Sequence, residues 1–207
     1  MANDPYILDE FSIDMLKEVG HICSGNATIA LSQVINQKIE LEIPDLKVIA
    51  VDQVMSTLGT SPEVLVGVSI SLLGNLNGNV VLMFPEKSAY GLIDSTAQVK
   101  TELSNTTEYG VSMLKEIGNI VISAYLATLS TFTRTIILHS TPNLVCGTMD
   151  TIFGVVFNKI LQEEKNIILV ETIFAIRERN MKGSFFFVFR PSVFKQLLND
   201  AKKYHQK

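Results

Sequence analysis

The chain has 207 residues, a formal net charge of -4 and a mean hydropathy of +0.29, with 47% hydrophobic and only 18% charged residues. This high content of hydrophobic residues predicts that most segments are buried on at least one face. No basic stripe is present, which argues against a non-specific nucleic-acid surface. Cys23 and Cys146 have no ligand-spaced partner, so we expect buried apolar thiols in a reducing compartment rather than a disulfide or zinc site.

Two stretches without charged residues, Val19–Gln37 and Ile117–Thr133, approach the length of a membrane span. Both contain Gly, Ser, Thr and Asn at close intervals, so they are interpreted as buried core helices. The N-terminus has an early acidic residue and no basic region, which is unlike a signal peptide. We therefore expect a cytoplasmic protein without membrane insertion.

The first half of the chain predicts a long helix, three strands and a short helix. Apolar residues recur at three- and four-residue steps in the first segment, and alternate with polar ones in the next. Pro44 should end or bend the first strand. The predicted elements are a helix over 11–36, strands over 38–51, 64–73 and 79–84 with a hairpin turn at 74–78, and a helix over 86–97.

The second half predicts the same order after a polar linker over 98–107. Its first strand contains Pro142, and additional apolar residues over 150–166 suggest an added helix. The predicted elements are a helix over 108–130, strands over 135–145, 167–176 and 184–189 with a hairpin turn across 179–183, and a helix over 191–202.

The two long helices carry a repeated stretch. Asp14 to His21 reads DMLKEVGH, and Ser112 to Asn119, 98 positions later, reads SMLKEIGN. The same offset separates Pro44 from Pro142. A repeat of this length indicates an internal duplication. We therefore predict an α+β fold in which two repeats, about 10–98 and 108–203, form a single pseudo-twofold domain over 1–207, with a shared six-stranded sheet and the helices packed against it.

Within each copy, three polar residues form a stripe along the helix. Ser112, Glu116 and Asn119 stand at i, i+4 and i+7, within a sector of about 60°. Asp14, Glu18 and His21 form the corresponding stripe in the first half. A solvated face would account for one such stripe. Lys, Gln or Ser would serve equally well on a solvated face, so the presence of glutamate at this position in both copies favours a functional role for the stripe.

The stripe is poorly equipped for most kinds of catalysis. The sequence shows no nucleophile–base pair of the serine or cysteine hydrolase kind. It also shows no catalytic pair of acidic residues supported by another segment, and no phosphate-binding glycine loop. An amide does not take a proton at neutral pH, but it can hold a water by accepting and donating hydrogen bonds. Phosphoryl transfer mainly requires positioning and charge stabilisation. The stripe therefore predicts a site that is completed by a protein supplying the phosphate and the metal.

The pattern Asp/Ser-x3-Glu-x2-Asn, followed 23 residues after the Asn by Pro, resembles the phosphatase signature of the CheC/CheX/FliY family. Ser112, Glu116, Asn119 and Pro142 match it fully, and Asp14, Glu18 and Pro44 match it with His21 in place of Asn. The two copies and the chain length are similar to the CheC members. This resemblance implies a chemotaxis phosphatase, acting in two-component signalling, that hydrolyses the aspartyl phosphate of the response regulator CheY.

By the same resemblance, Asn119 positions the attacking water and Glu116 contacts a lysine of the regulator. The chain needs no cofactor of its own, because the response regulator supplies the Mg²⁺, and the deamidase CheD is a further expected partner. The alternative is a non-enzymatic adaptor for CheD or a flagellar switch component, and a purely structural α+β domain is the third. His21 leaves the activity of the first site open, and His139 and His205 are interpreted as ordinary residues.

Overall fold

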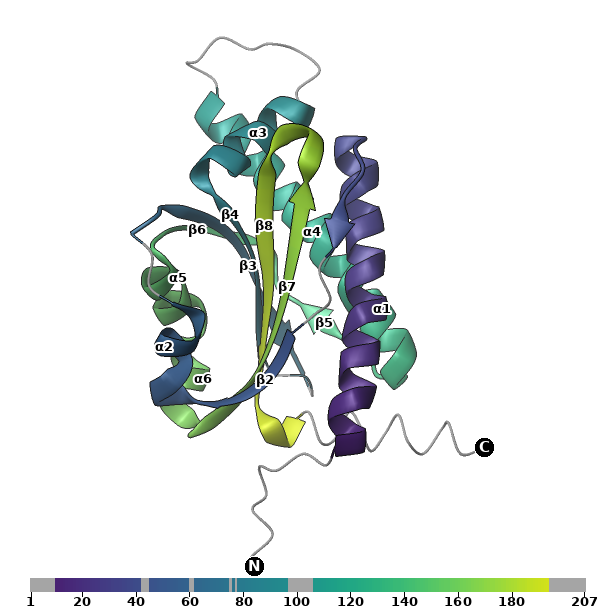
Figure 1. Ribbon diagram of the computed structural model, residues 1–207, viewed down its shortest axis with the longest axis vertical. Helices are drawn as coiled ribbons and strands as arrows, with labels where there is room; N and C mark the ends of the chain where they lie inside the picture. The colour runs from purple at the N-terminus through teal and green to yellow at the C-terminus, as the bar shows by residue number, and fades with distance from the viewer. Residues whose placement is uncertain are drawn as a thin grey trace, which may run out of the picture.

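The computed structural model describes residues 10–41, 45–59, 62–74, 76, 78–96 and 106–193 (Figure 1). In chain order the elements are α1 (Glu10–Ile35), β1 (Glu40–Leu41), β2 (Asp45–Ala50), η1 (Val51–Gln53), α2 (Val54–Leu58), β3 (Leu65–Leu73), β4 (Gly78–Pro85), α3 (Glu86–Thr96), α4 (Thr106–Thr133), β5 (Leu138–His139), β6 (Asn143–Gly147), α5 (Met149–Val156), α6 (Asn158–Glu163), β7 (Asn166–Ile176), η2 (Arg177–Arg179) and β8 (Met181–Phe189).

The strands of both halves share one antiparallel sheet with six positions, which confirms the predicted fold class. Each outer position is filled by two short strands in succession, so the order is β1 and β2, then β7, β8, β4, β3, then β5 and β6. The two hairpins meet edge to edge through β4 and β8. The outer strands are exchanged, however, because β1 and β2 pair with β7 of the second half, while β5 and β6 pair with β3 of the first.

The internal duplication is visible in the backbone. In the hairpins the offset between the repeats is 105, as Gly78 and Gly183 or Phe84 and Phe189 show. Val81 and Phe186 are therefore equivalent residues, and because they pair with each other between β4 and β8, the pseudo-twofold axis passes between them. The ends of α1 and α4 also match. Asn36 and Arg134, 98 positions apart, both adopt a left-handed backbone conformation with φ of 52° and 51°. Such a residue commonly ends a helix.

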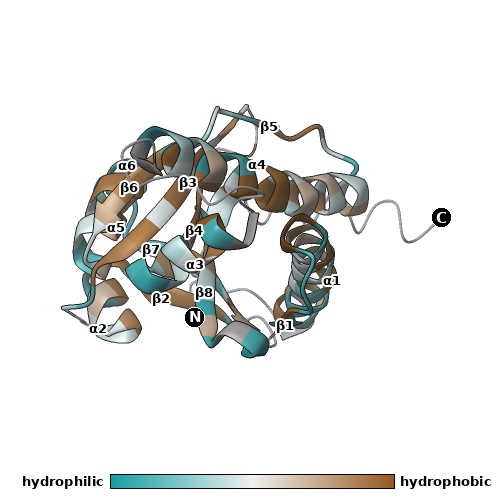
Figure 2. Ribbon diagram, turned by 90° about the horizontal axis from the view of Figure 1, so that it is seen from above, coloured by the Kyte–Doolittle hydropathy of each residue, from teal (hydrophilic) through white to brown (hydrophobic). Residues whose placement is uncertain are grey.

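Helices cover both faces of the sheet (Figures 1 and 2). Helices α1, α3 and α4 enclose one apolar core, and α2, α5 and α6 enclose the other. Central strands therefore place alternate side chains in different cores: Val80 and Leu82 contribute to the first, and Val81 and Met83 to the second. Burial on both faces explains why β4 and β8 are apolar almost throughout.

The two charge-free stretches lie in α1 and α4 and pack against the sheet, as predicted. Among the described helices, none is long and apolar enough to cross a membrane. Cys23 lies on the inner side of α1 and is fully buried, and this burial raises the pKa of its thiol to about 12. Cys146 was expected to be buried as well, but it lies exposed on the edge strand β6.

Three details differ from the predicted elements. The strand expected over 135–145 is interrupted, since residues 140–142 lie between β5 and β6. Within this break Ser140 donates its N–H to the carbonyl of Ser71 at 2.9 Å and accepts from the Ser71 N–H through its hydroxyl at 3.1 Å. Pro142 brings no N–H to a ladder, which accounts for a break at this point.

The second difference concerns the β7–β8 hairpin, whose turn was predicted across 179–183. Its turn is formed by η2 and Asn180, and β8 begins at Met181. Gly183 is therefore a strand residue, paired with Phe174, and a Cβ there would lie 2.3 Å from the Phe174 ring. This glycine serves close packing rather than a turn.

The third difference is that η1 and α2 were not predicted. They follow the first strand as α5 and α6 follow its counterpart, so the helical insertion is present in both halves and is longer in the second. The added helix expected over 150–166 is confirmed as α5 and α6. Most of the linker over 98–107 and of the final helix lies outside the described residues, which include a helical turn at 191–193.

Candidate active site

The second polar stripe lies on the outer side of α4. The side chains of Ser112 and Glu116 are exposed and that of Asn119 is half-buried, whereas Leu114 and Ile117 on the opposite side are buried in the core. The helix is therefore held by its apolar side and presents the stripe to solvent. The three polar groups fall on one ridge, as the sequence spacing predicts.

A glycine within the repeated stretch brings this ridge close to the sheet. Gly118, which precedes Asn119, is buried against β3, and a Cβ at this position would lie 2.4 Å from Cγ1 of Val68. No side chain fits there without movement of the helix or the strand. Gly118 thus allows α4 to pack close to β3, and this short distance between helix and strand sets the position of Asn119.

The first stripe has the same arrangement on α1. Asp14, Glu18 and His21 are all exposed, and Val19 behind them is buried. His21 presents an imidazole where Asn119 presents an amide. The proline that would belong to this stripe, Pro44, lies outside the described residues, whereas Pro142 of the second half is described and half-buried.

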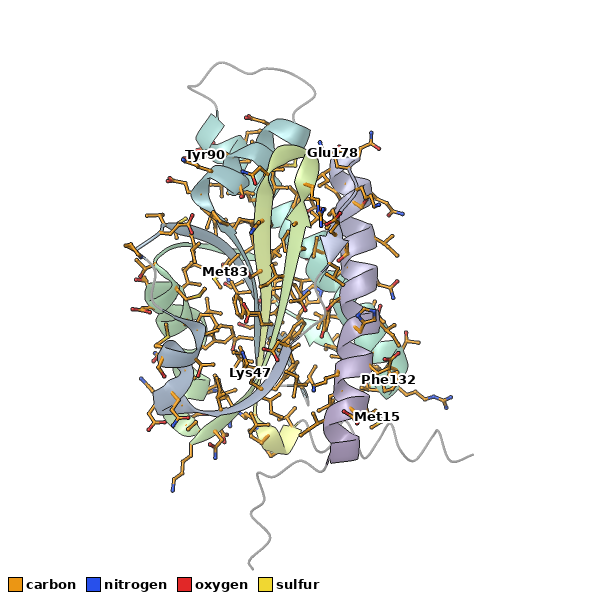
Figure 3. The ribbon with its side chains drawn as sticks, in the orientation of Figure 1. Met15, Lys47, Met83, Tyr90, Phe132 and Glu178 are labelled. Atoms are coloured by element: carbon orange, nitrogen blue, oxygen red, sulfur yellow. The ribbon has the colours of Figure 1, made fainter. Side chains whose placement is uncertain are left out.

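Helices α1 and α4 pack against each other in opposite directions (Figure 1). Asn26 of α1 donates a hydrogen bond to the hydroxyl of Thr128 of α4 at 3.0 Å. Met15 near the start of α1 and Phe132 near the end of α4 lie toward the same end of the pair (Figure 3). The stripes therefore lie toward opposite ends of the helix pair, separated along the helices by roughly 20 Å between their nearest residues and about 30 Å between their centres at a rise of about 1.5 Å per residue. The structure presents two separate sites rather than one composite site.

A further pair of polar side chains borders the second stripe. Ser123, one turn beyond Asn119, lies 3.3 Å from Nε2 of His139 on β5, and Nδ1 of His139 lies 2.9 Å from the carbonyl oxygen of Ser140. Both side chains are half-buried. The helical spacing of Ser123 was visible in the sequence, whereas His139 reaches the site only because β5 pairs with β3, through Leu72.

The stripe residues have their polar atoms available. Among the described residues, no hydrogen bond or ion pair is recorded for the side chains of Glu116 and Asn119. No cluster of three His, Cys, Asp or Glu side chains that could hold a metal is found in the described part of the chain. The ridge thus combines one carboxylate, one amide and one hydroxyl, a set that can bind a cation and orient a water molecule.

Comparisons with known proteins identify relatives of this chain. The model of the CheC-like family matches residues 110–146, which include the second stripe and Pro142. The "CheY-P phosphatase CheC" of Bacillus subtilis (strain 168) is 26% identical over 168 residues, covering 80% of each chain. The chain is therefore a distant homologue of a CheY-P phosphatase.

Solved structures show the same fold. FliY of Thermotoga maritima matches with a TM-score of 0.72 at 21% identity, over 95% of this chain and 98% of that one. The middle domain of FliM from H. pylori matches with a TM-score of 0.65 at 13% identity, over 93% and 99%. CheX in a CheX–CheY–BeF3–Mg²⁺ complex from Borrelia burgdorferi matches with a TM-score of 0.55 at 14% identity, over 83% and 99%. Residues 110–146 are thus similar to the CheC-like family, and the chain shares its fold with FliY, the FliM middle domain and CheX.

Proposed function

We propose that the chain hydrolyses the aspartyl phosphate of the response regulator CheY, and that it does so chiefly from the stripe on α4. The observation that carries this proposal is the placement of Ser112, Glu116 and Asn119 on one outward ridge of a helix anchored in the core. A ridge of this kind can enter the phosphorylated site of another protein. A cleft would be needed only if this chain bound a small substrate by itself.

In this proposal Asn119 orients the attacking water. Its amide oxygen accepts a hydrogen bond from the water and its NH2 group remains free to donate, and neither role requires a change of protonation. The amide thereby supplies the positioning that phosphoryl transfer needs. The Mg²⁺ ion belongs to the regulator, as the family resemblance implies, and no ligand from this chain is assigned to it.

Glu116 is assigned to docking and orientation. Its carboxylate is exposed one turn from Asn119, where it can pair with the cationic lysine of the regulator that the resemblance implies. Ser112 lies one turn further and extends the contact along the ridge. The distant relationship to a CheY-P phosphatase supports CheY as the substrate. On the same basis we propose a cytoplasmic site of action.

Replacement of Asn119 by alanine tests the proposal. Purified CheY is phosphorylated with a small phosphodonor, and the decay of the aspartyl phosphate is timed with and without catalytic amounts of the chain. We expect the wild type to accelerate the decay and Asn119→Ala to lose about 10²–10³-fold of that acceleration, the typical effect of removing one well-placed polar group.

The matched control is Asn158→Ala, which makes the same change in α6 on the other side of the sheet. It should leave the acceleration unchanged. If Asn119→Ala retained wild-type turnover, the assignment of this site would be wrong. If the wild type gave no acceleration, the enzymatic proposal as a whole would be wrong.

A second candidate role, as an adaptor for CheD or a flagellar switch component, is favoured by exposed apolar side chains at one edge of the sheet. Ile136 is 83% exposed, and Leu138 and Leu73, which pair between β5 and β3, are also exposed. Apolar side chains gathered at a surface commonly mark an interface. Titration with purified CheD, with Ile136→Lys as the altered chain, tests this role. Equal affinity for both chains would count against the edge as the binding surface.

A further inference from the structure

We infer that Ser123 and His139 extend the proposed site by one helical turn, with Ser123 contacting the phosphorylated regulator and His139 holding the Ser123 hydroxyl in place. This inference rests on the proposed function and concerns the same site. It arises from a hydrogen-bonded pair that joins α4 to β5 beside Asn119, at 3.3 Å between Ser123 Oγ and His139 Nε2.

The position of Ser123 on the helix is the first argument. At about 100° per residue it falls inside the sector occupied by Ser112, Glu116 and Asn119. As the i+4 neighbour of Asn119, its Cβ lies about 5–6 Å from that of Asn119. Ser123 is half-buried, so part of its side chain faces solvent beside the amide. A protein seated on Asn119 would therefore also cover Ser123.

The hydrogen bonding of Ser123 is the second argument. Other helix hydroxyls of this chain, those of Thr28, Thr128 and Thr131, donate to the carbonyl four residues earlier. Ser123 instead reaches across to His139, so its hydroxyl is held toward the edge of the site rather than folded onto its own helix. The hydrogen bond to His139 therefore determines which way the Ser123 Oγ points.

The surroundings of His139 define the direction of the bond. A carbonyl oxygen only accepts, so Nδ1 of His139, 2.9 Å from the Ser140 carbonyl, carries the hydrogen. In the neutral ring Nε2 is then the acceptor, and Ser123 donates to it. Ser140 is itself held by two hydrogen bonds to Ser71 on β3. The lone pairs of Ser123 Oγ therefore remain available to a donor on the regulator.

The first half of the chain lacks this pair. The repeat offset places Gly25 opposite Ser123 and Leu41 opposite His139. The strand register supports the second equivalence, because Leu41 pairs with Phe174 on β7 as His139 pairs with Leu72 on β3. Phe174 and Leu72 in turn pair with the equivalent glycines Gly183 and Gly78. The Ser–His pair is therefore a local property of the second site and not a requirement of the fold.

The test separates binding of the regulator from turnover. We expect Ser123→Ala to raise the KM for phosphorylated CheY about 3- to 10-fold, the effect of one lost hydrogen bond, with kcat within about twofold. His139→Leu, which places the residue of the other repeat there, should raise KM in the same way. Because His139 acts through Ser123, the double variant should be no worse than Ser123→Ala alone.

Two further variants exclude a merely structural role. His139→Gln carries an amide oxygen that can accept from Ser123, so it should retain a KM near that of the wild type. Thr131→Ala, on the same helix but away from the stripe, should change neither KM nor kcat. Unchanged far-UV circular dichroism and urea midpoints would establish that the variants are folded.

The outcomes are distinct from those of the proposed function. If the wild type accelerates the decay, Asn119→Ala does not, and Ser123→Ala has a wild-type KM, this inference alone is wrong. The inference is also wrong if the KM increases of Ser123→Ala and His139→Leu multiply in the double variant. A fall in kcat without a change in KM in either single variant would overturn it as well. If the wild type has no activity, the proposed function is wrong and the inference falls with it.

Discussion

At the level of single residues, the two stripes differ most in the group that would hold water. His21 and Asn119 occupy equivalent, outward-facing positions on α1 and α4. An imidazole can hydrogen-bond to water, but its two ring nitrogens lie at a different reach and angle from the oxygen and nitrogen of an amide. We therefore treat the second stripe as the principal site.

Restoring the amide tests whether the first stripe still docks the regulator. In an Asn119→Ala background, where the second site is silenced, His21→Asn should raise the rate of CheY-phosphate decay above that of the background. The remaining residues of the stripe, Asp14 and Glu18, are already exposed on the same ridge. An unchanged rate would mean that the first half has lost more than one residue needed for activity.

The residues of the second stripe could be predicted because a helix places i, i+4 and i+7 on one side whatever its surroundings. The Ser123–His139 pair could not be predicted in this way. His139 was expected to be an ordinary residue, since its approach to α4 depends on the pairing of β5 with β3, which no local pattern encodes. The role of each residue in catalysis stays a prediction until the variants are measured.

At the level of the helices, glycine serves two different purposes. Gly118 allows α4 to approach β3, where a Cβ would meet Val68 at 2.4 Å, whereas a Cβ on Gly25 in α1 would meet nothing within 4 Å. Gly118 and its counterpart Gly20 are both buried on the inner sides of their helices.

This contrast gives a matched pair of substitutions. Gly118→Ala should destabilise the fold by about 1–3 kcal/mol, because Val68 is fully buried and β-branched and must move with its strand. Gly25→Ala should stabilise it by up to about 1 kcal/mol, because alanine favours the helix. Urea unfolding followed by circular dichroism measures both changes. Equal midpoints for the two variants would contradict the packing role of Gly118.

At the level of the whole molecule, the exchange of outer strands ties the two halves together. The hairpins and the long helices were predictable from turn residues and periodicity. The exchange was not, because β1 and β2 pair with β7, more than 100 residues away, and the residues of an edge strand do not specify a distant partner. The short helix α2 was missed because five residues give too little periodicity.

We therefore propose that the two repeats form a single folding unit, and unfolding by two local probes tests this. The Cys23 thiol reports on α1, since its burial, with a pKa of about 12, should prevent alkylation at pH 8 until the first half opens. Hydrogen exchange of β8, at the centre of the sheet, reports on the second half. A Cys146→Ser background removes the exposed thiol from the assay.

The urea dependence of the two signals should coincide in one transition. Opening of the first half removes β1 and β2 from β7 and β4 from β8, so the second half would lose pairing along both sides of its hairpin. An exposed hairpin of this size is only marginally stable in water. Cys23 labelling that is complete at urea concentrations where β8 remains protected would show two independent units, and would contradict the single domain.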